Sequence, residues 1–394
     1  MADAGPVRIG IVGTGNIARV HAKALNAVTG GPAASNGDGR AATPSAMIVG
    51  ATDTDGSRLG AFGEEFGIPG TYPSLDGLLS QGRPDLVHIC TPPSAHYAAA
   101  LACLRARVSV LVEKPPVLSL RELDELAAAE GRDGKGPWFA TVFQHRFGSG
   151  QRRLKSLCES GVLGKPLLAV CHTTWFRDQA YFDVDWRGRW DTEGGGPTMG
   201  HGIHQMDMLL DVLGDWTEVS ALARTQARTV ETEDLTLAHV TFANGAVASV
   251  VNSVLSPREE SYLRFDFERA TVEVTHLYGY TDADWTITPA PGAERAERTE
   301  RAPGAADAAD EIETAWAHGE RGIASGHAAQ FQHVLQALRD GRRPPVTPAE
   351  SRRTLALVAG IYASAFTRRP ISPDDLAPDT PFYGAMNGGL TEWS

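Results

Sequence analysis

A glycine-rich turn between a strand and a helix constrains the fold of this chain more than any other feature. Residues 7–12 form a short β-branched run that is typical of a buried parallel strand. A GxGxxA pattern follows, and a helical pattern continues to about residue 28. In this pattern the first glycine permits a tight turn, the second lets the backbone approach a diphosphate, and the small third residue keeps helix and strand close. The sequence therefore predicts a dinucleotide site at the helix N-terminus that includes Gly13, Gly15, Asn16 and Ile17.

A second expected mark is an acidic residue at the end of the next strand, about 20 residues after the turn. Asp53 ends the strand-like run 47–52, but it lies 38 residues after Gly15. Residues 29–45 are rich in Gly, Ala, Ser, Asn and Pro, so we interpret them as a 17-residue surface insertion, and without them the spacing is 21. Two interpretations of Asp53 stay open: it binds a ribose, or it caps the following helix.

The charges at this position bear on the choice of cofactor. The carboxylate of Asp53 would repel a 2′-phosphate, which favours NAD over NADP. Arg58 is close enough in sequence to accept such a phosphate, so NADP remains an alternative. We expect NAD, with both residues in the cofactor site.

Strands and helices keep alternating through the first third of the chain, which predicts a doubly wound parallel sheet. Ligands of such sheets bind at the carboxyl ends of the strands. Four polar residues follow strand ends and are therefore expected to share one crevice: Asp53, Thr91, Lys114 and Gln144. The predicted division is a dinucleotide-binding Rossmann domain over 1–145 and a substrate-binding and oligomerisation domain over 146–394.

The composition excludes several other classes of protein. The net charge of −12 disfavours nucleic acid and anionic membranes as partners, because their phosphates would be repelled. No apolar run approaches the roughly 18 residues of a spanning helix, and the short acidic N-terminus leaves no room for a signal peptide. The four cysteines have no metal-binding spacing, so we expect no metal and a cytoplasmic location.

Several motifs in order along nearly the whole chain resemble the glucose–fructose oxidoreductase and inositol dehydrogenase family, often called Gfo/Idh/MocA. Their order and spacing together make the resemblance specific. They are the turn at Gly13, Thr91-Pro92-Pro93-Ser94-Ala95-His96, Glu113-Lys114-Pro115, Phe143-Gln144-His145-Arg146-Phe147, the turn 160–165, the glycines 194–196 leading to His204, and Gly326-His327.

The resemblance implies a Rossmann domain followed by an α/β domain with a large, mostly antiparallel open sheet. It implies NAD(P)-dependent oxidation or reduction of a sugar, inositol or related polyol. It also implies a homo-oligomer, dimer or tetramer, formed through the open sheet. Further cofactor-binding residues are expected from the matching motifs at Thr91, Pro92, His96, Glu113, Lys114, Gln144, Trp186 and Arg187.

The second domain supports an antiparallel sheet independently of the resemblance. Alternating apolar patterns over 219–225, 235–242, 246–254, 262–268 and 270–275 are typical of half-buried strands, and Asn244-Gly245 between two of them is a strong hairpin turn. Residues 288–322 are rich in Ala, Glu, Arg and Pro and are expected to form an exposed excursion. Residues 327–340 and 348–367 show amphipathic helical patterns.

A segment dense in aromatic residues and arginines, 175–190, follows the first strand of this domain. Aromatic faces stack on the C–H faces of sugars, and guanidinium groups donate to hydroxyls. The segment is either a wall of the substrate site or a loop that packs its aromatics over the core. The substrate-binding residues expected from it and from the neighbouring motifs are Lys114, Arg146, Trp175, Arg177, Tyr181, His201 and His204.

Three interpretations of His204 stay open. It is a buried structural histidine, a member of a metal face with His201 and Asp207, or the catalytic histidine that the resemblance places after the glycine-rich loop. The sequence departs from the family here, because many members carry an acid where this chain has Gly200. We expect His201 or Asp207 to compensate, and Lys114 gains weight in proton transfer.

The resulting hypothesis is hydride transfer between a secondary alcohol and nicotinamide, with Lys114 and His204 meeting beside the cofactor as the catalytic pair. A surface ion pair is the alternative role for Lys114. Two other functions stay open: NAD-dependent glycoside cleavage with transient oxidation, and cofactor binding without catalysis. The sequence does not select the sugar.

Overall fold

The computed structural model describes residues 5–29, 45–132, 134–291 and 308–393. The chain forms two compact units, and it passes between them three times. The first unit comprises 1–143 and 327–352, and the second comprises 144–326 and 353–394. The first boundary lies near the expected one at 145, but the second unit is interrupted, because 26 residues after 326 pack with the first unit.

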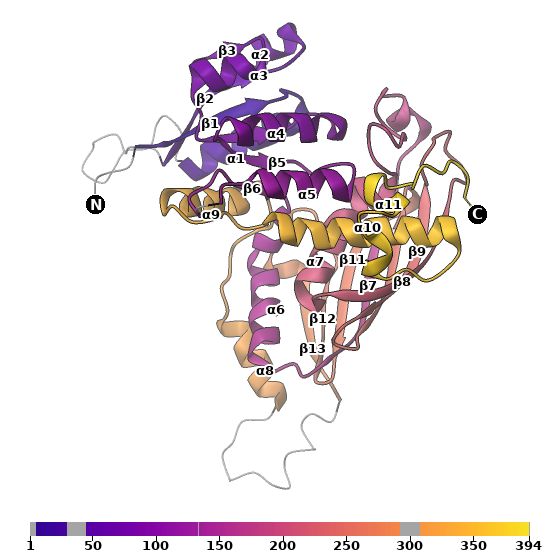
Figure 1. The fold of residues 1–394 in the computed structure, drawn as a ribbon. Helices are drawn as coiled ribbons and strands as arrows, with labels where there is room; N and C mark the ends of the chain where they lie inside the picture. The colour runs from indigo at the N-terminus through magenta and orange to yellow at the C-terminus, as the bar shows by residue number, and fades with distance from the viewer. Residues whose placement is uncertain (1–4, 30–44, 133, 292–307, 394) are drawn as a thin grey trace. The chain divides into compact units, whose positions relative to one another are not determined.

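The sheet of the first unit is parallel and has the strand order β3-β2-β1-β4-β5-β6, as in a doubly wound dinucleotide-binding fold (Figure 1). This confirms the predicted fold class. The strands are β1 Val7–Val12, β2 Ala46–Thr52, β3 Thr71–Tyr72, β4 Leu86–Ile89, β5 Ser109–Val112 and β6 Phe139–Thr141. The helices of this unit are α1 Asn16–Thr29, α2 Gly56–Phe66, α3 Leu75–Gly77, α4 His96–Arg105, α5 Leu120–Ala129 and α9 His327–Arg339.

Helix α9 completes the core of the first unit. Its buried Phe331, Val334 and Leu335 pack in one cluster with Ile9 of β1 and Leu25 of α1. The apolar period of 327–340 predicted the helix, but a period does not say which sheet a helix covers. The long separation in sequence between α9 and β1 therefore hid this contact.

The sheet of the second unit has the order β13-β12-β11-β7-β10-β9-β8 and is antiparallel except for the β7–β10 pair (Figure 1). The predicted mostly antiparallel sheet is confirmed. Gly245, with a φ of 88°, closes the hairpin between β9 and β10. The strands are β7 Pro166–Phe176, β8 Trp216–Arg224, β9 Leu235–Phe242, β10 Val247–Ser253, β11 Leu255–Phe267, β12 Ala270–Val274 and β13 Trp285–Pro289.

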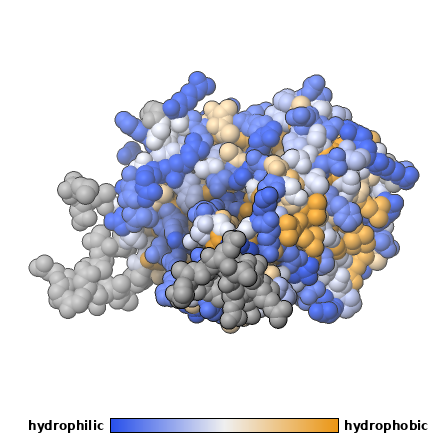
Figure 2. Space-filling model, turned by 90° about the horizontal axis from the view of Figure 1, so that it is seen from below, coloured by the Kyte–Doolittle hydropathy of each residue, from blue (hydrophilic) through white to orange (hydrophobic). Residues whose placement is uncertain are grey.

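The two faces of this sheet differ in character. Alternate residues of β9 and β10 are buried on one face, whereas the other face leaves apolar side chains exposed. Figure 2 shows hydrophobic side chains gathered on one side of the surface that it presents. On this second face the exposed large apolar residues of strands β7 to β10 are Leu168, Phe176, Leu222, Leu237 and Val247.

The helices of the second unit correct one expectation. These helices are α6 Ser149–Ser160, α7 Ile203–Leu213, α8 Ala308–His318, α10 Pro348–Thr367, whose first turns belong to the first unit, and α11 Pro381–Gly384. Helix α8 lies within the expected exposed excursion 288–322, and strand β13 extends into its first two residues. Ile312 and Trp316 of α8 are buried, and the guanidinium of Arg153 lies 4.2 Å from the Trp316 ring. The expectation of an exposed segment was therefore wrong for α8. Ile312 and Trp316, four residues apart, form the face of this helix that packs into the core.

Two further expectations concern the periphery of the chain. The expected insertion 29–45 lies, between 30 and 44, outside the described residues. Within the described part of the chain, the search for a helix both long and apolar enough to span a bilayer finds none.

Candidate functional site

The glycine-rich turn has the shape that a diphosphate requires. Gly13 has a φ of 82°, and an added Cβ would lie 2.9 Å from the backbone of Cys90 and Thr91, so this position accepts only glycine. An added Cβ at Gly15 would meet no atom within 4 Å. The second glycine therefore faces open space at the start of α1, where helix N–H groups lack partners within the helix. The turn fits a dinucleotide.

Asp53 lies directly after β2 and is bound to this turn. Its carboxylate accepts hydrogen bonds from the backbone and hydroxyl of Thr14, at 2.7 and 2.8 Å, and from the backbone of Asp55. The guanidinium of Arg58 adds two more, at 2.7 and 3.1 Å. Burial opposes ionisation, but these hydrogen bonds hold the pKa of Asp53 far below its ordinary value. Asp53 is not the cap of α2, because the side chain of Asp55 caps this helix by accepting from the backbone N–H of Arg58.

The loops after β4 and β5 are joined by a buried histidine. His96, at the start of α4, lies with Nδ1 2.8 Å from the carbonyl oxygen of Pro115 and Nε2 2.9 Å from that of Thr91. The sequence expectation placed His96 and Thr91 in the cofactor site. His96 is 1% exposed, so its side chain holds the two loops rather than facing solvent, while Pro92 is exposed.

Glu113 and Lys114 follow β5, and their side chains differ in exposure. Glu113 is buried, and its carboxylate accepts from His21, His327 and the backbone N–H of Lys114. Lys114 itself is partly exposed. Among the described residues, His21, Glu113 and His327 are a group whose nitrogen and oxygen atoms all lie within 4.8 Å of one another.

In the second unit a buried carboxylate binds the loop that precedes the helix of His204. Glu233 accepts from the backbone of Gly196 and Thr198, each at 3.0 Å, and from the hydroxyl of Tyr362 at 2.9 Å. Gly196 must be glycine, because a Cβ there would lie 2.0 Å from the carbonyl of Glu233. After this loop the chain forms a π-helical turn over Thr198–Gly202 and continues as α7.

His204 lies in the first turn of α7 within a group of aromatic rings. It is 1% exposed, and its ring contacts His145 and Tyr278, with centroids 4.8 and 5.3 Å away. Tyr278 also contacts Trp175, at 4.7 Å. Sequence reasoning missed Tyr278, because it lies in the irregular segment after β12, where no periodic pattern marks it.

The aromatic and arginine-rich segment gathers around His201. The Tyr181 hydroxyl lies 3.4 Å from Nε2 of His201, and the Trp175 ring is 5.1 Å from that of His201. The guanidinium groups of Arg187 and Arg177 lie 3.7 and 5.5 Å from the Tyr181 ring. The structure thus brings five of the sequence-predicted residues together, and Trp186 lies beside Arg187, at 5.0 Å.

Arg146 and Asp207 form a buried ion pair. Two guanidinium nitrogens of Arg146 lie 2.5 and 2.6 Å from the Asp207 carboxylate, and Thr354 donates to the same carboxylate. Burial raises the pKa of Asp207, while Arg146 opposes that rise. The Asp207 carboxylate is therefore engaged by Arg146 and Thr354. Its expected role as a replacement for the missing acid at Gly200 stays a prediction, as does the substrate-binding role of Arg146. Gln144, near Arg146, is buried.

A different carboxylate lies at the place of the missing acid. An added Cβ at Gly200 would lie 3.4 Å from Oε1 of Glu193, a residue that is 6% exposed. The other carboxylate oxygen of Glu193 accepts from the backbone of Gly188 at 2.7 Å. Sequence reasoning missed Glu193, because a single acid before a glycine run carries no signal of its own.

Both units of the chain match models of one known protein family. A model described as an oxidoreductase family with an NAD-binding Rossmann fold matches residues 7–138, and the GFO/IDH/MocA C-terminal domain matches residues 151–277. The two matches share one family and together cover about two thirds of the chain. The chain belongs to the GFO/IDH/MocA family. The resemblance inferred from the motifs is therefore confirmed.

Individual relatives match most of the chain at modest identity. The D-glucoside 3-dehydrogenase of Escherichia coli is 26% identical over 298 residues, which covers 69% of this chain and 79% of the relative. The D-apiose dehydrogenase of Paraburkholderia graminis is 25% identical over 356 residues, covering 87% and 88%. The crystal structure of the WlbA dehydrogenase from Chromobacterium violaceum, in complex with NADH and UDP-GlcNAcA, has a TM-score of 0.74 and 25% identity, covering 94% of this chain and 99% of that one.

Substituting Gly15 by alanine separates cofactor binding from folding. The Cβ enters open space, so we expect an unchanged thermal midpoint for the variant without cofactor. It fills the space that a diphosphate approaches, so the dissociation constant of NAD rises by about tenfold or more. Calorimetric titration and thermal unfolding of the same samples measure both. Gly13→Ala is the contrasting variant, because its Cβ strikes backbone and lowers the midpoint; unchanged NAD affinity in Gly15→Ala would contradict the proposed diphosphate position.

Proposed function

We propose that this chain is an NAD(P)-dependent oxidoreductase that transfers a hydride between nicotinamide and a secondary alcohol of a sugar, inositol or related polyol. The observation that carries the proposal is the open turn at Gly15 with Asp53 bound beside it, in a chain of this family. The names of the E. coli and P. graminis relatives support a sugar or sugar derivative as the substrate.

The residues of the first unit bind the cofactor and handle a proton. A bound nicotinamide supplies or accepts the hydride. The start of α1 binds the diphosphate, and Gly15 leaves the room for it. Lys114 takes the proton of the alcohol during oxidation and returns it during reduction, because it is a partly exposed amine at the carboxyl end of β5.

The residues of the second unit bind and orient the sugar. The rings of Trp175 and Tyr181 offer faces for the C–H groups, and Arg177 and Arg187 offer donors for hydroxyl or anionic groups. His204 holds a hydrogen bond to the reacting hydroxyl. Glu193 supplies a carboxylate beside Gly200, where many members of the family carry an acid.

The cofactor is NAD in this proposal, with NADP as the alternative that Arg58 supports. Five donors already occupy the Asp53 carboxylate, about as many as its lone pairs accept. A ribose diol can therefore bind Asp53 only where Arg58 turns away. The Arg58 guanidinium is held by Asp53 at the end of β2, where it could pair with the 2′-phosphate of NADP.

We also propose that the chain works as a homo-oligomer in the cytoplasm. The exposed apolar side chains on β7 to β10 would be covered by a second copy, and all four cysteines are free thiols. Light scattering on the purified chain is expected to give a dimer or tetramer, and Leu237→Asp to lower the mass. A monomer at every concentration would contradict this assembly.

A screen of sugars, inositols and glycosides with NAD and with NADP tests the function itself. We expect the absorbance of reduced nicotinamide to appear with at least one substrate. Release of an aglycone without net reduced cofactor would instead favour glycoside cleavage. Binding of NAD with no turnover across the screen would favour a non-catalytic protein.

Replacing Lys114 by methionine and His204 by asparagine tests their roles separately. We expect kcat to fall about 100-fold or more for Lys114→Met, because proton transfer by a positioned group contributes 10²–10⁴-fold. His204→Asn should lower kcat about tenfold or more and raise KM. The dissociation constant of NAD should stay within about threefold of the native value for both. Exposed Lys165→Met and His318→Asn are matched controls, and near-native turnover in both test variants would contradict the mechanism.

Replacing Arg58 by alanine tests the cofactor preference. The change frees Asp53 for ribose hydroxyls and removes the cation that would meet a 2′-phosphate. We expect the ratio of kcat/KM for NAD to that for NADP to rise about tenfold. Arg105→Ala, on the exposed face of α4, is the control. A ratio that falls in Arg58→Ala would show that the Asp53 carboxylate does not face the ribose.

A further inference from the structure

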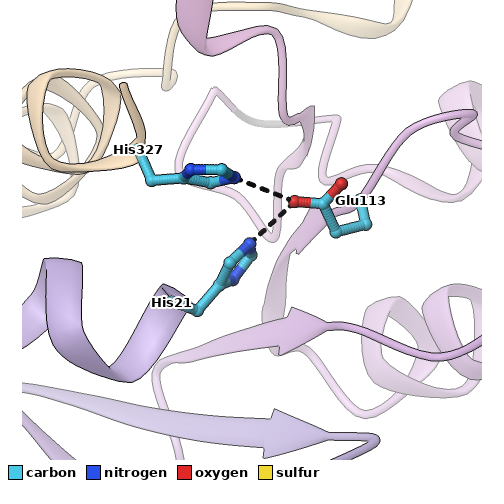
Figure 3. A group of neighbouring side chains, drawn as sticks. All are labelled: His21, Glu113 and His327. Atoms are coloured by element: carbon cyan, nitrogen blue, oxygen red, sulfur yellow. Dashed lines mark hydrogen bonds and ion pairs between the residues drawn. The ribbon is translucent and has the colours of Figure 1, made fainter. Parts of the chain in front are cut away.

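One buried carboxylate in the first unit has contacts that the proposed function does not use. Glu113 is 5% exposed, and Figure 3 shows two imidazoles pointing at one of its oxygens. Nε2 of His21, from α1, lies 2.8 Å from Oε1, and Nε2 of His327, from the first residue of α9, lies 3.2 Å from the same atom. The three side chains come from segments far apart in sequence and meet at this oxygen.

The arrangement is that of hydrogen bonds rather than of metal ligands. Ligands converge on an empty point that the metal fills, whereas both imidazole nitrogens here are directed at the carboxylate oxygen itself (Figure 3). Each imidazole can donate an N–H to an ionised carboxylate. Burial opposes the negative charge, but these hydrogen bonds hold the pKa of Glu113 well below its ordinary value.

The other ring nitrogen of His21 contacts His88 of β4 and Cys90, which follows β4. Nδ1 of His21 lies 3.0 Å from Nδ1 of His88 and 3.3 Å from Sγ of Cys90. Burial lowers the pKa of both histidines. Where Nδ1 of His21 accepts from His88 or Cys90, the ring proton lies on Nε2, which faces Glu113. The negative charge therefore stays on the carboxylate.

The other oxygen of Glu113 faces the backbone of the next residue. Oε2 accepts the backbone N–H of Lys114 at 3.1 Å. On the far side of Lys114, the carbonyl of Pro115 lies 2.8 Å from Nδ1 of His96. The backbone on both sides of Lys114 is thus fixed by buried side chains, so the direction in which its side chain leaves β5 is fixed as well.

We propose that Glu113 is the positioning residue for Lys114, and that His21 and His327 hold its carboxylate in place. This rests on the proposed function, because it gives Lys114 the proton-transfer role. The negative charge has a second effect: it favours the ammonium form of the neighbouring lysine. Glu113 therefore sets both the place and the proton affinity of that amine, although its own side chain is buried away from solvent.

Glu113→Gln tests the proposal, because the amide keeps the shape and removes the charge. Glu130→Gln is the matched control: Glu130 in the same unit is also a buried carboxylate that accepts a backbone N–H, from Phe139, and it pairs with Arg343. We expect Glu113→Gln to lower kcat about tenfold or more, with KM and the NAD dissociation constant within about threefold of the native values. Glu130→Gln should leave kcat unchanged.

A second readout needs no turnover. The chain has only five lysines, so reductive methylation with ¹³C-formaldehyde gives few NMR signals, and Lys114→Met assigns the one that matters. We expect the pKa of methylated Lys114 to be lower by about half a unit or more in Glu113→Gln than in the native chain, because a nearby negative charge is gone. His327→Asn removes one of the two groups that hold the carboxylate. We expect it to change the pKa of methylated Lys114 by a smaller but measurable amount.

Two results would overturn the proposal. One is a Glu113→Gln variant with native kcat and a native Lys114 titration. The other is stoichiometric metal in the purified protein that is lost in Glu113→Gln, since Glu113 would then be a ligand. Failure of the proposed function is separate: if Lys114→Met keeps native turnover, the proton role is wrong, while the NMR titration still shows whether Glu113 controls that amine.

Discussion

The first unit depends on burying one negative charge where three segments meet. Glu113 brings the end of β5 together with α1 through His21 and with α9 through His327. A buried carboxylate destabilises a fold unless its oxygens accept hydrogen bonds. Removing any one donor would leave the charge with fewer hydrogen bonds and would lower the stability of the unit. The same α1 begins at the open glycine turn, and the same β5 ends at Lys114. The contacts that stabilise the unit therefore also determine where the dinucleotide turn and the amine lie on its sheet.

The second unit solves a similar problem with two other buried acids. Glu233 accepts hydrogen bonds from the backbone of the glycine-rich loop, and Asp207, on α7, pairs with Arg146. Both acids are fully engaged, so they support the helix and leave His204 among the aromatic rings of its first turn. The absence of a side chain at Gly200 leaves room that the carboxylate of Glu193 borders.

Local pattern predicted much of this structure, because local pattern reflects local physics. Strand β1, the turn at Gly13 and helix α1 follow from β-branched residues, glycine conformations and helical period, and the hairpin at Gly245 follows from turn chemistry. The return of α9 to the first sheet, the burial of Trp316, and the meeting of His21, Glu113 and His327 depend on contacts between distant segments. Neither a period nor a motif encodes such contacts, so Tyr278, Glu193 and the ion pair between Arg146 and Asp207 were missed.

Isotope tracing follows the hydride itself from a secondary alcohol carbon to nicotinamide. A sugar found active in turnover would be prepared with deuterium at its ring carbons in turn, and the reduced cofactor analysed by mass spectrometry. The account predicts that one labelled position, and only one, transfers its deuterium to the nicotinamide. Reduced cofactor without deuterium from any position, or label that is lost to water while the sugar is cleaved, would contradict it.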